Sequence, residues 1–130
     1  MSVSIIPAQG TSIVQQVSIV HSPTWSIVGN SAANTAITLT RPLESGRTHI
    51  ITGCEAVISG AAPTVDIPID IMTGASNLWR SFIGAAAASG TRTGFVNNNL
   101  QCFTSQSASI SAIAGGTNCF VTLNLTGYTI

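Results

Sequence analysis

The chain carries few side chains suited to acid–base chemistry. Its 130 residues include four Arg, two Asp, two Glu, two His and no Lys, so charged residues make up 6% of the total. Asp66 and Asp70 are two carboxylates on the same face of a predicted strand. On a strand that rises about 3.3 Å per residue they would lie roughly 13 Å apart, which exceeds the carboxylate separations of glycosidases. We therefore interpret them as charges that protect an edge strand from aggregation.

His21, His49 and Cys54 are the remaining candidates for a nucleophilic or metal site. Cys54 follows His49 by five residues, so on a straight strand the two side chains would face opposite sides, unless Gly53 marks a bulge. The chain lacks zinc-ligand spacing and the GxSxG, GxGxxG and P-loop motifs. We expect no catalytic residue, no cofactor and no metal, and we do not expect an enzyme.

The cysteines and the apolar segments bear on the cellular compartment. Cys54, Cys102 and Cys119 are an odd number without a CxxC pair, which favours buried free thiols in a reducing compartment and leaves open one cross-strand pair. The first seven residues lack the features of a secretory signal, and residues 82–88 are too short an apolar run to span a membrane. We expect no membrane partner, and the sequon Asn124-Leu-Thr126 is then a chance match.

So sparse a set of ionic groups favours a surface that packs against other proteins. A monomer of 13.3 kDa should expose roughly 6,400 Å², or about one charge per 800 Å². The net charge of zero also favours association. Four scattered arginines cannot form the basic face that binds nucleic acid, so we expect no nucleic-acid partner.

The composition predicts an all-β fold. Ile, Val and Thr number 16, 9 and 16, and these β-branched residues suit pleated, half-buried surfaces. We predict an antiparallel β-sandwich of seven to nine strands, either jelly-roll or immunoglobulin-like, with an extended N-terminal arm. Residues 1–33 are interpreted as this arm or as a first strand pair, and residues 34–130 as the sandwich domain.

Alternating apolar and polar residues place the individual strands. The predicted strands are residues 12–20, 25–28, 36–40, 48–59, 65–71, 78–83, 107–113 and 119–125. Pro68 has no N–H for a ladder, so strand 65–71 is predicted to be an edge strand. Residues 115–118 are predicted to be a hairpin turn that joins the last two strands, and residues 84–106 are the least regular part.

One run of the chain resembles a family of phage proteins. The run His49-Ile-Ile-Thr-Gly53-Cys-Glu-Ala56-Val-Ile-Ser59-Gly-Ala61 resembles the pattern H-x-I-T-G-x-x-A-x-x-S-x-A of small proteins encoded among the head genes of tailed bacteriophages. Trp79 and the end Leu123-Asn-Leu125-Thr-Gly127-Tyr128-Thr129 fit the same pattern, so the resemblance covers about residues 48–130. Residues 72–77 depart from it where the family has an Asp-Gly turn.

The resemblance implies a structural protein of the virion. Such proteins are capsid decoration (cement) proteins that stabilise the phage head as homotrimers clamped onto the major capsid protein. The implied location is the capsid surface, after assembly in the host cytoplasm, and no catalytic residues are implied. The alternative is a β-sandwich module of a phage tail or capsid surface that recognises a host protein or glycan.

Several side chains are candidates for contacts with these partners. Arg47 and Arg80 are expected to pair with Glu44 and Glu55, within the protein or across a subunit contact. The aromatic residues Trp25, Trp79 and Tyr128 could stack on sugars, although packing in the core is the commoner role. The residues predicted to contact other proteins are Trp25, Arg41, Arg47, Arg80, Asn97, Asn98 and Asn99.

Overall fold

The computed structural model describes residues 24–130, which form strands and loops without a helix, and residues 1–23 lie outside this description. The predicted all-β fold is therefore confirmed, whereas the predicted strand at 12–20 and the extended arm fall on residues that are not described. The strands are β2 (Thr24–Asn30), β3 (Ile37–Arg41), β4 (His49–Gly60), β5 (Ile67–Thr73), β6 (Ser76–Ile83), β7 (Arg92–Phe95), β8 (Leu100–Gln101), β9 (Ala108–Ala112) and β10 (Cys119–Thr129).

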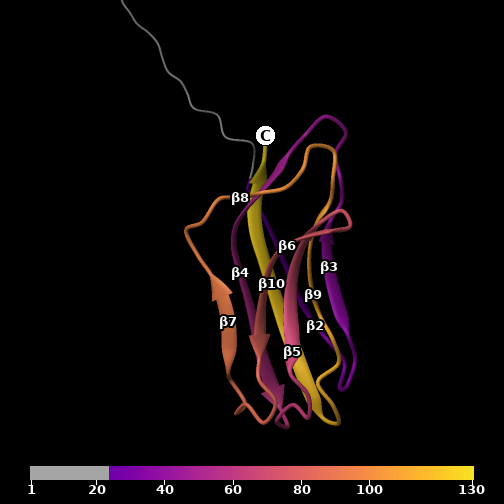
Figure 1. The fold of residues 1–130 in the computed structure, drawn as a ribbon, viewed down its shortest axis with the longest axis vertical. Coiled ribbons are helices and arrows are strands. Elements are labelled where there is room, and N and C mark those ends of the chain that lie inside the picture. Colours follow the sequence, from indigo (N-terminus) through magenta and orange to yellow (C-terminus); the bar gives the residue numbers. More distant parts are fainter. Residues whose placement is uncertain (1–23) are drawn as a thin grey trace, which may run out of the picture.

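The strands form two antiparallel sheets that pack face to face (Figure 1). One sheet has the order β2-β10-β4-β7, with β8 also paired to β4, and the other has the order β3-β9-β5-β6. Apart from the short β8, the described strands pair from the outside inward: β2 with β10, β3 with β9, β4 with β7, and β5 with β6. This rolled double ribbon is the jelly roll, so the topology is not immunoglobulin-like.

The core follows directly from the alternation in the sequence. Ile67, Ile69 and Ile71 of β5 are fully buried, while the residues between them face outward. Leu123 and Leu125 of β10 meet them from the facing sheet as part of the same hydrophobic cluster. Burying a branched aliphatic side chain stabilises a fold by about 1.5–3 kcal/mol, so these alternating rows supply most of the driving force for the two sheets to associate.

The prediction that residues 65–71 form an edge strand is wrong. β5 lies between β9 and β6 and pairs with both. Its ladder with β9 begins at Ile69, one residue after Pro68, so the missing N–H of Pro68 falls outside that ladder. The two carboxylates do not guard an edge either, because Asp70 is ion-paired with Arg80 of β6 and Asp66 accepts a hydrogen bond from the N–H of Ala85.

The predicted hairpin at residues 115–118 is also wrong. β9 belongs to one sheet and β10 to the other, so this connection crosses between the sheets. The alternating pattern found both strands, but the length of a loop does not show whether the strands on either side pair. The irregular region 84–106 contains two short strands, β7 and β8, that the pattern did not predict.

A bulge in β4 decides which side chains of its first half face the core. Thr126 of β10 lies opposite Gly53, but the next residue, Gly127, lies opposite Ile51, so Thr52 is an extra residue. This extra residue reverses the alternation, and His49 therefore faces the core together with Cys54. The bulge that Gly53 suggested is confirmed.

Gly127 should be essential to this arrangement. A Cβ at Gly127 would lie 2.2 Å from the carbonyl oxygen of Ile50 and 2.7 Å from the Trp25 ring. We expect Gly127→Ala to lower the free energy of unfolding by about 3 kcal/mol, because backbone cannot move aside as a flexible side chain can. Gly84→Ala is the matched control, since the nearest atom there is 3.9 Å away. Equal urea unfolding midpoints for the two variants would contradict this account.

Candidate functional site

Two loops and the C-terminus meet at one end of the sandwich, which we call the C-terminal end (Figure 1). Thr48 and Ile130 exchange two backbone hydrogen bonds of 2.9 Å, which hold the C-terminus against loop 42–48. The N–H of Gly46 donates to Ser105 Oγ at 2.8 Å, which ties loop 102–107 to the same place. β2 also begins here, because Thr24 lies opposite Tyr128.

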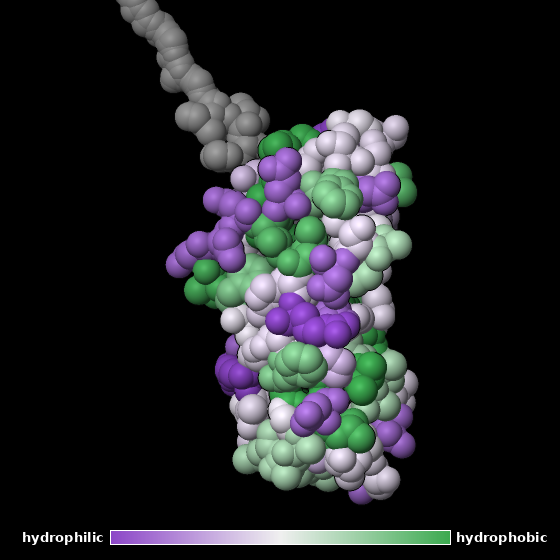
Figure 2. Space-filling view, in the orientation of Figure 1, coloured by the Kyte–Doolittle hydropathy of each residue, from purple (hydrophilic) through white to green (hydrophobic). Residues whose placement is uncertain are grey.

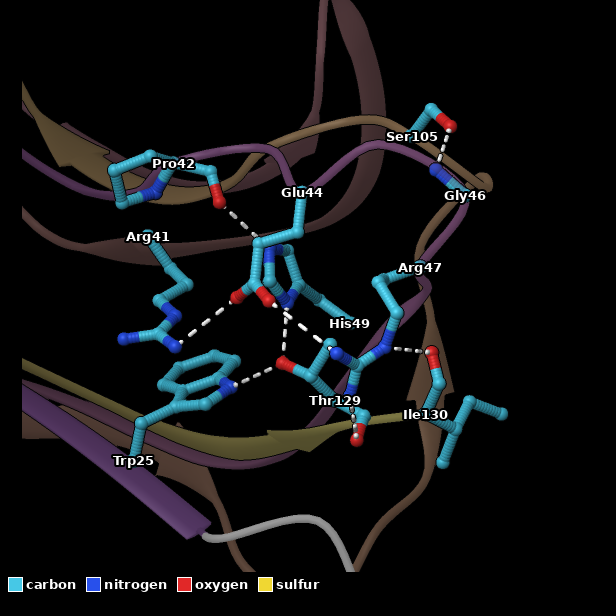
Figure 3. Close-up of polar contacts among 10 residues, drawn as sticks. All are labelled: Trp25, Arg41, Pro42, Glu44, Gly46, Arg47, His49, Ser105, Thr129 and Ile130. Atoms are coloured by element: carbon cyan, nitrogen blue, oxygen red, sulfur yellow. Dashed lines mark hydrogen bonds and ion pairs between the residues drawn. The ribbon is translucent and has the colours of Figure 1, made fainter.

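A buried chain of hydrogen bonds holds this end together (Figure 3). His49 Nε2 lies 2.8 Å from the carbonyl oxygen of Pro42, which can only accept, so Nε2 carries the proton. With the proton on Nε2, Nδ1 can accept from the Thr129 hydroxyl at 2.7 Å. The same hydroxyl accepts from Trp25 Nε1–H at 3.1 Å. Each polar group in this chain is satisfied, so the network fixes three strands without an unpaired buried atom.

An arginine pair covers the network from the solvent side (Figure 3). Arg41 and Arg47 both approach Glu44, at 3.1 and 3.7 Å. The Arg41 guanidinium lies 5.7 Å from the centre of the Trp25 ring, within reach of a cation–π contact. Arg47 Nε donates to the carbonyl oxygen of Ile130 at 3.2 Å. These ion pairs are partly exposed and contribute little on their own, so the buried His49 chain carries most of the local stability.

The structure brings three of the seven predicted contact residues together. Trp25, Arg41 and Arg47 meet at the C-terminal end, and the expected pair between Arg47 and Glu44 is present. Arg80 lies elsewhere, on the outer face of the other sheet, and pairs with Asp70 rather than with a glutamate. The contact role of all seven residues stays a prediction. The other three residues are exposed in the loop between β7 and β8: Asn97, Asn98 and Asn99.

Three exposed hydrophobic side chains at this end were missed by the sequence analysis. Leu43, Phe103 and Ile130 are 56%, 57% and 59% exposed. They lie in loops or at the terminus, where no alternation marks a residue as facing outward. The N–H of Phe103 donates to Thr73 Oγ1 at 2.9 Å, which fixes its loop. In one face of the molecule, hydrophobic and hydrophilic residues are interspersed along its length (Figure 2).

A separate open groove of about 710 Å³ lies against β4, β7 and β10. Gly53 and Gly94 contribute no side chains to its lining, and Val96 lines it as well. Arg92 donates to Glu55 at 2.9 Å, so the carboxylate of the groove is already paired. Asn124 also lines the groove. Cys54 lines the groove as well, but its thiol is buried. Such a groove can bind a neutral polar ligand.

The three cysteines are free and buried. Burial raises the pKa of the Cys54 thiol to about 11, and burial also raises the pKa of Cys102 and of Cys119. A protonated, buried thiol is a poor nucleophile and a poor metal ligand. Within residues 24–130 no three His, Cys, Asp or Glu side chains gather as a metal site, and His21 lies outside that range.

The aromatic candidates mostly pack against protein. Trp25 is buried, and Trp79 packs edge-on against Phe95 with ring centres 5.1 Å apart. Tyr128 is half-buried on the outer face of its sheet. No helix in the described part of the chain is long and apolar enough to cross a membrane.

Comparisons with known proteins find only distant similarity. No protein-family model matches the chain, and no curated protein matches it. A chain of the extra small virus particle of the giant freshwater prawn Macrobrachium rosenbergii is 16% identical, with a TM-score of 0.34 over 95% of this chain and 90% of that one. A chain of infectious bursal disease virus, Gx strain, is 13% identical, with a TM-score of 0.35 over 85% of this chain and 32% of that one.

Replacing Thr129 should break the buried hydrogen-bond chain. Thr129→Val keeps the shape of the side chain but leaves Trp25 Nε1–H and His49 Nδ1 without partners, so we expect a loss of about 2–4 kcal/mol in the free energy of unfolding. Thr122→Val is the control, because its hydroxyl bonds Asn30 at an exposed site and should cost about 0.5 kcal/mol or less. Urea unfolding measures both. Losses of the same size would show that the network stabilises nothing.

The raised pKa of Cys54 should make stability fall at alkaline pH. The unfolded thiol titrates near its ordinary value of 9.0 and the folded thiol at about 11. The stabilisation is therefore complete below pH 9 and is lost as the pH rises from 9 to 11. We expect the free energy of unfolding to fall less steeply over this range in Cys54→Ala than in the natural chain. Parallel slopes in urea unfolding would refute the shift.

Proposed function

We propose that this protein is a structural component of a virus particle: a decoration (cement) protein that clamps major capsid subunits as a homotrimer. The observation that carries the proposal is a surface whose charges are neutralised within the chain itself while large hydrophobic side chains remain exposed. Such a surface is suited to lying against protein rather than water.

Most of the charges are paired within the chain. Each of the four arginines forms an ion pair with a carboxylate of the same chain, and Arg41 and Arg47 share Glu44. The remaining acid, Asp66, accepts a hydrogen bond from the N–H of Ala85 at 2.8 Å. An unpaired charge buried at an interface is costly, whereas a pair that is already formed brings no uncompensated charge with it. A neighbouring subunit can therefore cover most of this surface with few counter-charges of its own.

The exposed hydrophobic residues of the C-terminal end provide the contact area. Leu43, Phe103 and Ile130 lie on loops that are tied to one another by hydrogen bonds, so they form a fixed rather than a collapsible surface. Stable interfaces between permanent partners are apolar, like a domain core cut in half. We assign this end to the contact with the major capsid protein.

The jelly-roll topology agrees with this role, because this architecture recurs in viral capsid proteins. It also occurs in lectins and cupins, so the fold supports a virion role by analogy. The resemblance of residues 48–130 to small phage head proteins points to the same role, with the capsid surface as the location and the host cytoplasm as the place of assembly.

The open groove favours a second candidate function, recognition of a host glycan or protein. Its amide, carboxylate and guanidinium groups, from Asn124, Glu55 and Arg92, are of the kind that bind sugar hydroxyls. Binding of the purified protein to a glycan array that is lost in Asn124→Ala would favour this function over the decoration role.

A particle-binding assay tests the decoration role. The purified protein should have the mass of three 13.3 kDa chains by light scattering and should bind particles assembled from the major capsid protein of the same virus. Leu43→Asp should reduce its occupancy on particles about tenfold or more, because a charge would be buried at the contact.

Val65→Asp is the matched control, since Val65 is 44% exposed in the loop at the opposite end. It should bind as the natural chain does. A monomer at micromolar concentration, or failure of the natural chain to bind particles, would overturn the proposal. Equal binding by both variants would overturn the assignment of the contact to the C-terminal end.

A further inference from the structure

One outer strand of the sandwich has an open edge. The N–H of Ser31 donates to the carbonyl oxygen of Val121 at 2.8 Å, so alternate residues of β2 point their backbone groups toward β10. The residues between them, Ser26, Val28 and Asn30, therefore direct N–H and C=O away from the sheet. No strand of residues 24–130 pairs with this edge.

This edge lacks the features that protect the other outer strands of the described sandwich. β3 ends in Arg41, β6 carries Arg80 and a bulge, and β7 is only four residues long and begins with Arg92. β2 is seven residues long, with no charge, no proline and a regular ladder to β10. A long, uncharged open edge is a template for pairing with another strand.

We propose that residues 12–20 of a second copy of this chain pair with the open edge of β2. These residues alternate in polarity as a strand does, with Ile13, Val17 and Ile19 on one face. The whole of residues 1–23 contains no Asp, Glu, Lys or Arg. An uncharged strand that continues an uncharged sheet adds hydrogen bonds without burying an unpaired charge.

The sequence between this segment and β2 opposes pairing within one chain. Only His21, Ser22 and Pro23 separate residue 20 from Thr24. A three-residue hairpin loop needs a left-handed residue in its last position, and proline is fixed at a φ of about −65°. Folding back onto the same β2 is therefore strained, whereas a neighbouring copy can receive the segment without a tight turn.

Exchange of this kind is compatible with a trimer. Each copy would give one strand and receive one, and a head-to-tail exchange whose rotation closes after three copies forms a ring. In this respect the inference rests on the homotrimer proposed above and supplies the contact that would hold it together.

Hydrogen exchange on the full-length natural protein tests the pairing. The amides of Ser26, Val28 and Asn30 should exchange slowly at high protein concentration and about tenfold or more faster after dilution to the monomer. Fast exchange at every concentration would overturn the proposal. Slow exchange in a sample that light scattering shows to be monomeric would mean that the strand comes from the same chain, and it would overturn the proposal as well.

A pair of substitutions tests the link to assembly. Val28→Pro removes an N–H that bonds nothing in residues 24–130, so the fold should persist, as judged by circular dichroism, while the trimer is lost. Val28→Thr keeps the N–H and should remain a trimer. A folded Val28→Pro trimer would overturn the strand exchange while leaving the decoration role intact. If the natural chain fails to bind particles while its β2 amides still exchange slowly, the decoration role is overturned and the strand exchange is left intact.

Discussion

The bulge in β4 opposite Gly127 is the constraint on which the C-terminal end depends. Without the extra residue Thr52, His49 would face the solvent, and the hydroxyl of Thr129 would have no acceptor. The glycine is required because the two strands and the Trp25 ring leave no room for a Cβ. The bulge at Thr52, opposite Gly127, thus determines how the loops of the C-terminal end and the C-terminus come together.

The sequence predicted the strands well, because a strand with one face in the core must alternate. It did not predict which strands share a sheet. Residues 115–118 have the composition of a hairpin turn, but the connection crosses from one sheet to the other. Pro68 suggested an edge, yet it lies just beyond the ladder with β9, so β5 still pairs with β9 from Ile69 onward. Pairing depends on contacts between distant residues, which local patterns do not contain.

The candidate site was predicted in its residue types more than in its geometry. Trp25, Arg41 and Arg47 are of the residue types that are enriched at interfaces. Their proximity follows from the register of β2, β4 and β10, which local sequence patterns do not reveal. The exposure of Leu43 and Phe103 could not be predicted, because the sequence pattern around an apolar loop residue does not show whether its side chain is buried or exposed.

The local pairing of every arginine has a consequence for how fast such a protein finds its partners. With no excess of either sign on its surface, long-range attraction cannot guide an encounter. Association should then proceed at the unassisted rate of about 10⁵–10⁶ M⁻¹s⁻¹ and change little with ionic strength. Temperature and subunit concentration, rather than salt, would govern how quickly the protein joins other subunits, since hydrophobic attraction weakens on cooling.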